Sequence, residues 1–129
     1  MTDALLDTTF FIDLHRGHLG AHRVWDKIEA GNLTASFSTI TAFELWLGEH
    51  VSRAEELFYL ALFNLLEEAT LTVSAAVRAA LWLRSFPENL SERFIRDALI
   101  AASALERGEV VYTQNVRDFQ RFYADVKRY

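Results

Sequence analysis

The chain has 129 residues, of which 51% are hydrophobic and 13% aromatic, a size and composition typical of one well-packed domain. It contains no cysteine, so disulfides and thiolate metal sites are excluded. The net charge of −5 argues against a protein that coats nucleic acid through a broadly basic surface. No apolar stretch approaches the ~20 residues of a membrane span, and the first residues lack the pattern of a secretory signal. We therefore expect a soluble, cytoplasmic protein with no membrane partner.

The first half of the sequence alternates short apolar runs with helical patterns. A strand is predicted over Ala4–Asp7, followed by a helical pattern that starts at Phe10–Arg16, is interrupted by Gly17 and Gly20, and continues to about Ala30. Leu33–Phe37 alternates with small and β-branched residues and is predicted to be a second strand. Ser38 or Thr39 can cap a helix that runs to Leu47, and Arg53–Leu66 is apolar at helical spacing.

The second half repeats the alternation. Ala69–Val73 is a short candidate strand, and a helix beginning at Ser74 is expected to end before Pro87. Asn89 or Ser91 can cap the next helix, which runs to Arg107 and stops at Gly108. Val110–Thr113 is β-branched and aromatic, which favours a strand. A short helix near Val116–Phe122 and an edge strand over Ala124–Lys127 complete the prediction.

Short strands that alternate with longer helices predict an α/β fold. We expect one domain over residues 1–129, with three α/β/α layers and a short, mostly parallel central sheet flanked by helices. Ligands of such sheets bind beyond the carboxyl ends of the strands. Asp7 lies at one such end, and Thr113–Asn115 lies at another.

Acidic residues stand where the predicted fold should bury them. Asp97 shares its helical face with Phe94, Ala101 and Ala104, a face of mostly small apolar side chains that can approach another element closely. A buried carboxylate costs several kcal/mol unless something compensates its charge. The sequence therefore predicts either a partner or a functional role for Asp97.

Glu44 follows the same pattern. Its neighbours one helical turn away are Ile40, Leu47 and Gly48, so its face is also predicted to be buried. For each single acid, a surface position or an ion pair is an equally good interpretation, with Arg93, Arg96 or Arg117 as candidate partners. Three such acids together favour a shared site.

A hard cation relieves the mutual repulsion of converging carboxylates. Mg²⁺ and Mn²⁺ take oxygen ligands and often use only one or two carboxylates each. Such a site can activate a water molecule and hold phosphate oxygens. The acids therefore predict a metal site for chemistry on phosphates.

With these residues identified, the sequence resembles PIN-domain ribonucleases, in particular the VapC-type toxins of prokaryotic toxin–antitoxin pairs. The similar segments are LLDTTFFIDL, TAFELWLG, RDALIAASALERG and VVYTQNVRDFQRF, whose order and spacing cover essentially the whole chain. The resemblance implies a Mg²⁺- or Mn²⁺-dependent endoribonuclease that cleaves RNA phosphodiester bonds with an activated water. It also implies a small antitoxin partner that occupies the active-site groove, and a homodimer.

The resemblance maps three catalytic and metal-binding acids onto Asp7, Glu44 and Asp97. Many relatives carry a fourth acid where this chain has Asn115, and Asp118 follows three residues later in the same motif. Either residue is a candidate for the fourth position. Candidates for hydrogen bonds that fix the carboxylates are Thr8 or Thr9, together with Thr113. Arg16 and Arg117 are candidate contacts of RNA phosphates.

Other signals favour ordinary structural roles. His15, His18 and His22 resemble a metal-binding spacing, but glycines interrupt their helix, and solvated surface is the better interpretation. The aromatic residues, including those of the apolar run 57–66, are expected in the core or at a dimer or antitoxin contact. A phosphatase with an aspartyl nucleophile is disfavoured, because Thr9 stands where the second acid is needed. A non-catalytic RNA-binding or interaction domain, and a housekeeping nuclease without antitoxin, stay open as alternatives.

Overall fold

The computed structural model describes residues 2–48, 51–86, 88, 91–123 and 125–129. Within these ranges, five strands form one sheet with the order β3-β2-β1-β4-β5, and every neighbouring pair is parallel. The strands are β1 (Ala4–Leu6), β2 (Ala35–Ser38), β3 (Glu67–Ala69), β4 (Val110–Tyr112) and β5 (Val126–Lys127). The predicted parallel sheet is confirmed.

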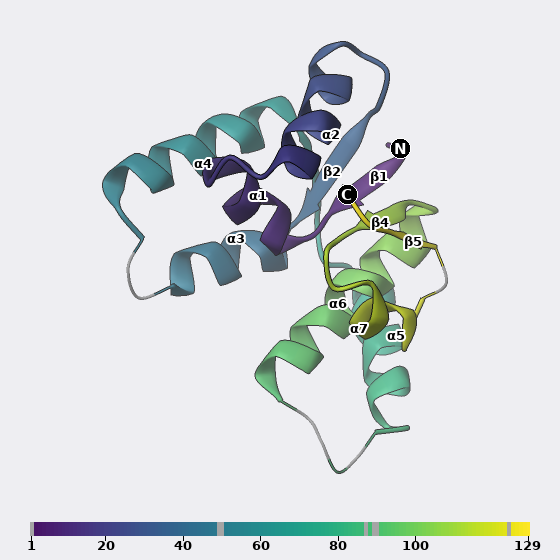
Figure 1. The fold of residues 1–129 in the computed structure, drawn as a ribbon. Helices are drawn as coiled ribbons and strands as arrows, with labels where there is room; N and C mark the ends of the chain where they lie inside the picture. Colours follow the sequence, from purple (N-terminus) through teal and green to yellow (C-terminus); the bar gives the residue numbers. More distant parts are fainter. Residues whose placement is uncertain (1, 49–50, 87, 89–90, 124) are drawn as a thin grey trace.

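Helices connect the strands and lie on both sides of the sheet (Figure 1). They are α1 (Thr8–His15), α2 (Leu19–Glu29), α3 (Thr39–Leu47), α4 (Arg53–Leu65), α5 (Val73–Leu83), α6 (Glu92–Arg107) and α7 (Val116–Gln120). Among the helices of the described ranges, none combines the length and the apolar character that a bilayer crossing requires.

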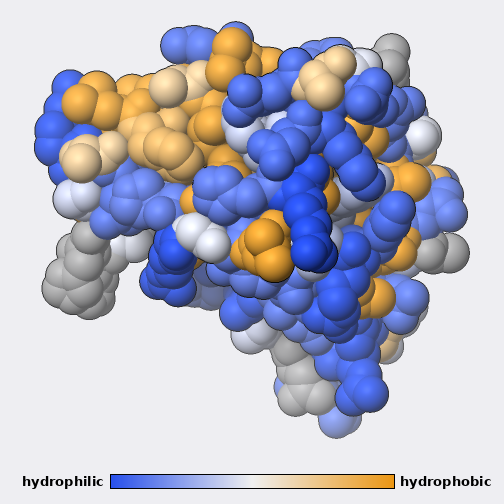
Figure 2. All heavy atoms as spheres, turned by 45° about the horizontal axis from the view of Figure 1, so that its top comes forward, coloured by the Kyte–Doolittle hydropathy of each residue, from blue (hydrophilic) through white to orange (hydrophobic). Residues whose placement is uncertain are grey.

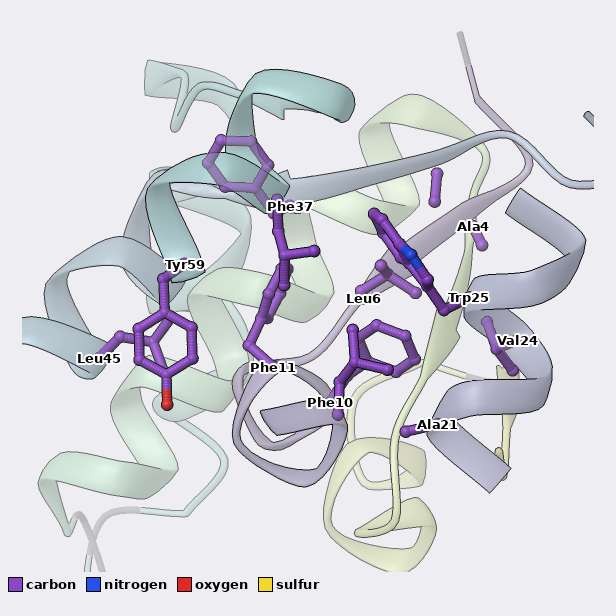
Figure 3. Close-up of a cluster of buried hydrophobic side chains, with 13 residues drawn as sticks. Ala4, Leu6, Phe10, Phe11, Ala21, Val24, Trp25, Phe37, Leu45 and Tyr59 are labelled. Carbon is purple, nitrogen blue, oxygen red and sulfur yellow. The ribbon is translucent and has the colours of Figure 1, made fainter. Parts of the chain in front are cut away.

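The central strand β1 explains why the protein has three layers. Its three residues are all buried, but successive side chains point to opposite faces of the sheet. Ala4 and Leu6 pack in one cluster with Phe10, Phe11 and other residues of the α1, α2 and α4 side (Figure 3), whereas Leu5 packs on the α6 side. A parallel sheet with both faces covered is the arrangement that such continuous apolar strands favour.

Side-chain caps fix where the helices begin and end. The Ser38 hydroxyl accepts a hydrogen bond from the Ile40 amide at the start of α3, and Ser91 accepts from the Phe94 amide at the start of α6. Helix α6 ends at Gly108, whose φ of 68° is the left-handed conformation that glycine adopts without strain. The sequence predicted Asn89 or Ser91 as the cap of α6, and the cap by Ser91 is confirmed.

The third strand was placed wrongly by sequence. Ala69–Val73 was the candidate, but β3 covers Glu67–Ala69, and Thr72 caps α5, which begins at Val73. Edge strand β3 exposes Glu67 and Glu68, so it lacks the apolar pattern of a buried strand. Helix α1 also starts two residues earlier than expected. The predicted features at Pro87, Asn89 and Ala124 lie outside the described residues.

A buried ion pair joins the amino ends of the strands, opposite the end at which Asp7 lies. Glu109 has no exposed surface, and Arg107 Nε donates to its Oε1 over 2.6 Å. The second oxygen, Oε2, accepts from Ser36 Oγ over 2.8 Å and from the Thr2 hydroxyl. Arg107 also contacts Glu67 of β3 at 2.7 Å. The pair thus ties residues of β2 and β3 to the start of β4.

Removing the arginine from this pair is expected to destabilise the fold. Arg107→Met leaves Glu109 buried without its charged partner, which typically costs about 3–5 kcal/mol of unfolding free energy. Arg53→Met removes a comparable charge from an ion pair with Glu56, whose arginine side chain is 75% exposed, and should cost less than about 1 kcal/mol. Denaturant unfolding of both variants measures the difference, and equal losses would contradict the assignment.

Candidate functional site

Asp7 begins the candidate site at the carboxyl end of the central strand. Its backbone amide continues the sheet by donating to the Tyr112 carbonyl over 3.0 Å, and its side chain caps α1 by accepting from the Thr8 amide over 2.7 Å. Its Oδ2 accepts from the hydroxyls of Thr9 at 3.1 Å and Thr113 at 2.8 Å. Asp7 is only 3% exposed, so this carboxylate is held rigidly.

Asp97 approaches the same place from α6. It is 7% exposed, and the small residues Ala101 and Ala104 on its face are completely buried, as the sequence predicts. Among the described residues, no ion pair or hydrogen bond engages the Asp97 carboxylate. The charge of Arg93 acts on Asp97, but the structure buries this acid without the direct ion pair that a purely structural role would require.

Glu44 lies at the rim of the site rather than on a fully buried face. Leu47, one turn away, is 54% exposed, because α3 turns this end toward the surface. Arg96 Nε donates to Glu44 Oε2 over 2.9 Å, and the Thr8 hydroxyl donates to Oε1 over 2.7 Å. The expected burial of the whole Glu44 face was wrong, and its pairing with Arg96 was one of the alternatives.

All three acids line one cavity of about 230 Å³, together with Thr8, Thr9, Arg93 and Arg96. A second hollow of about 680 Å³ shares Asp97 and Arg93 with it and extends between α6 and α7. The predicted convergence of Asp7, Glu44 and Asp97 on one region of the protein therefore holds in the structure.

Burial and repulsion raise the pKa values of the two deepest acids. The pKa of Asp7 is raised, chiefly by burial, although its hydrogen bonds from Thr113, Thr8 and Thr9 oppose the increase. The pKa of Asp97 is raised to about 7, first by burial and then by the negative charge of Asp7, although the positive charge of Arg93 opposes the increase. Both carboxylates thus resist ionisation unless a positive charge joins them.

The residues present suit a single hard cation. Asp7 and Asp97 are two buried carboxylates, and one or two carboxylates are the usual protein ligands of Mg²⁺. Across the described part of the chain, no three Asp, Glu, His or Cys side chains gather closely enough to hold an ion. The structure therefore brings Glu44 into the cavity but engages it with Arg96 instead of placing it beside the other two acids.

The remaining predicted residues divide into two groups. Thr113 is completely buried against Asp7, and its hydroxyl accepts from the Asn115 amide over 2.9 Å. Asp118 lines the larger hollow beside Asp97, and its charge contributes to the raised pKa of Asp97. Asn115, Arg16 and Arg117 line neither of these two cavities.

Sequence reasoning named Arg93 and Arg96 only as pairing partners, but both line the acidic cavity. The available signal was their position on α6, where Arg93 lies one turn before Asp97 and Arg96 directly precedes it. Tyr129 was missed entirely. Its hydroxyl donates to Asp13 over 2.6 Å and lies 3.2 Å from the hydroxyl of Thr9, which itself donates to Asp7. No local pattern connects residue 129 with α1.

The sequence of the chain matches the model of a known protein family. The PIN domain model matches residues 4–125, nearly the entire chain. The chain belongs to the PIN domain family. The resemblance seen in the sequence is thereby confirmed, and the segments that carry Asp7, Glu44 and Asp97 all lie within the matched region of the PIN domain.

Solved structures show the same fold over nearly the full length of the PIN domain. A chain in the structure of VapBC2 from Rickettsia felis, bound to a promoter DNA fragment, is 18% identical with a TM-score of 0.77 and 98% coverage of both chains. A chain of VapBC-1 from nontypeable Haemophilus influenzae is 25% identical, with a TM-score of 0.69 and coverage of 98% and 96%.

A third similar structure is VapC20 from Mycobacterium tuberculosis, described as a Sarcin-Ricin loop cleaving toxin. It is 20% identical, with a TM-score of 0.71 and coverage of 97% of this chain and 99% of that one. A search of curated protein sequences finds no match. The PIN domain described here therefore has the fold of VapC-type toxins.

The raised pKa of Asp97 predicts a specific pH dependence of stability. Between its ordinary value of 3.8 and about 7, the folded state holds a proton that the unfolded state has lost, so stability should fall as pH rises through this range. Asp97→Asn removes this dependence. In chelator at pH 8, the variant should melt at least ~3 °C higher than wild type.

Melting curves from pH 4 to 8 measure this difference. Asp26→Asn, an exposed change on α2, is the control and should follow the wild-type curve. If Asp97→Asn melts lower than wild type at pH 8, or its melting temperature has the same dependence on pH, ionisation of Asp97 does not destabilise the folded protein.

Proposed function

We propose that this PIN domain is a metal-dependent endoribonuclease and the toxin component of a VapBC-like toxin–antitoxin pair. The observation that carries the proposal is the pair of buried carboxylates, Asp7 and Asp97, at the carboxyl ends of the strands. An inactive domain gains nothing from acids whose ionisation costs folding free energy. Membership of the PIN family and the fold of VapC-type toxins support the same reaction class.

Asp7 and Asp97 would hold the divalent cation, Mg²⁺ or Mn²⁺, because both carboxylates are buried and neither forms an ion pair within the described residues. A cation bound there would supply Lewis-acid charge and lower the pKa of a water molecule for attack on phosphorus. Glu44, at the rim, is placed to orient that water or to complete the ligand set through water. The charge-assisted hydrogen bond from Arg96 fixes the direction of the Glu44 carboxylate.

Hydroxyl groups hold the carboxylates of Asp7 and Glu44 in place. Thr113 and Thr9 both donate to Asp7 Oδ2, which leaves the orientation of this carboxylate little freedom. Thr8 donates to Glu44 and lies 3.0 Å from the hydroxyl of Thr41 on the same helix as Glu44. Such supporting hydrogen bonds hold ligands in the geometry that the reaction needs.

For the fourth position, the geometry favours Asp118 over Asn115. Asp118 lines the hollow that also contains Asp97, and its negative charge acts on Asp97. The Asn115 backbone amide donates to the Thr113 hydroxyl, and Asn115 lines neither of the two cavities. Asp118 is paired with Arg121 at 3.7 Å, so we assign it a supporting role at the edge of the site.

The exposed face of α4 supports a protein partner. Leu57, Leu60 and Leu65 are 52%, 44% and 70% exposed, and Figure 2 shows hydrophobic side chains gathered over this helix. Large apolar patches of this kind commonly mark protein contacts. Similar chains occur in VapBC structures, so we propose a small antitoxin as partner and a homodimer as the assembly.

RNA cleavage by purified protein tests the proposed reaction. Cleavage should require Mg²⁺ or Mn²⁺ and stop in excess chelator. Asp7→Asn and Asp97→Asn should each lower the rate at least ~10²-fold, the scale of losing one preorganised electrostatic group. The measurement is the initial rate of cleavage of a structured RNA under single-turnover conditions.

The exposed Asp26→Asn change is the matched control and should cleave at the wild-type rate. Undiminished cleavage by both active-site variants would contradict the assignment. RNA binding without cleavage under every metal condition would instead identify a non-catalytic binding domain. Activity without growth arrest on expression, and without any partner, would identify a housekeeping nuclease.

A further inference from the structure

The larger hollow beside the site has the size of a ligand pocket. Its volume of about 680 Å³ lies within the ~300–1,000 Å³ range typical of small-molecule sites, whereas the acidic cavity is smaller. The hollow lies where the end of α5, the start of α6 and the short α7 meet. The proposed phosphodiester chemistry takes place in the smaller cavity, and the larger hollow contributes only Asp118 at its edge.

One wall of the hollow is aromatic. Phe86 and Phe94 both line it, with ring centroids 5.3 Å apart. Both rings are half-buried, and Phe122 supports them from behind at 5.9 Å and 5.0 Å. Half-buried rings on a firm base present apolar surface to whatever enters the hollow.

Two arginines stand beside this wall. The Arg121 guanidinium lies over the Phe94 ring, 5.4 Å from its centroid, and Arg93 is exposed on the adjoining turn of α6. A planar guanidinium both stacks on flat rings and binds phosphate oxygens. Asp118 and Glu88 bring negative charge into the hollow, which disfavours a phosphate inside it. A base inside and phosphates along the arginines satisfy both constraints.

The hollow is continuous with the acidic cavity, because Asp97 and Arg93 line both. A nucleotide whose base lies against Phe86 and Arg121 would therefore place a neighbouring phosphate near Asp7 and Asp97. This continuity distinguishes the hollow from the separate cavity between α1, α2 and α4, which shares no residue with the site.

We propose that this hollow binds one unpaired base of the RNA substrate, next to the phosphate that is cleaved. Phe86 and the Arg121 guanidinium, which lies over the Phe94 ring, stack on the base, Arg93 contacts an adjoining phosphate, and Asp118 accepts a hydrogen bond from an exocyclic amino group. A paired base cannot enter, because its edge and both faces are already engaged in the duplex. The inference rests on the proposed nuclease function and names its substrate as RNA with an unpaired, amino-bearing base at the cleavage site.

Fluorescence of a short single-stranded RNA that carries 2-aminopurine tests this proposal. The full chain with Asp7→Asn, in excess chelator, holds the RNA uncleaved, which a gel verifies after each titration. Binding should quench the 2-aminopurine by stacking. Phe94→Leu, which keeps apolar volume next to Phe122, and Arg121→Gln should each weaken binding at least about fivefold. The matched control, Arg78→Gln, removes an exposed arginine of α5 and should leave affinity unchanged.

Each variant is first shown to melt cooperatively within a few degrees of its parent. Quenching that both hollow variants leave unchanged would overturn the proposal, as would equally tight binding of the same sequence in a duplex. Equal weakening by Arg78→Gln would also overturn it, because binding would then follow overall charge. Failure of the nuclease proposal is distinguishable: wild type would not cleave with Mn²⁺, yet the quenching and its loss in both hollow variants would persist.

Discussion

The burial of two acids, Asp7 and Asp97, in one region of the protein is the constraint on which the rest of the site depends. Burial raises the pKa of both acids, and the charge of Asp7 raises that of Asp97 further. The protein surrounds Asp7 with hydroxyl and amide donors but gives Asp97 none among the described residues. A fold that keeps such a pair retains a strain that one divalent cation can relieve.

The parallel sheet is what makes this crowding possible. Leu6 is in register with Phe37 of β2 and Tyr112 of β4, so the residues that follow these strands emerge side by side. Asp7 and Thr113 are two of them, and the third, Ser38, starts the helix that carries Glu44. At the amino ends of the strands, Glu109 forms an ion pair with Arg107. The buried acid at the amino ends of the strands thus has an ion pair, whereas Asp7 and Asp97 at the carboxyl ends have none among the described residues.

Two of the acids could be predicted from local patterns. Asp7 ends an apolar strand, and Asp97 interrupts a face of small residues, so both conflicts are visible in the sequence. The pairing of Glu44 with Arg96 joins residues 52 positions apart, and Arg93, Arg96 and Arg117 were equally good candidates from the sequence. Strand β3 was misplaced because its exposed glutamates at the sheet edge hide the strand signal. The aromatic hollow depends on how α5, α6 and α7 meet, which periodicity within each helix does not determine.

A manganese-soaked crystal tests the central claim most directly. Anomalous scattering locates Mn²⁺ without assumptions about activity, substrate or partner. We expect one strong anomalous peak between the carboxylates of Asp7 and Asp97, at the ~2.0–2.2 Å oxygen distances of a hard divalent ion. The same soak of an Asp97→Asn crystal should lose the peak. A fully soaked wild-type crystal with no peak there, or with manganese only at distant surface acids, would contradict the account.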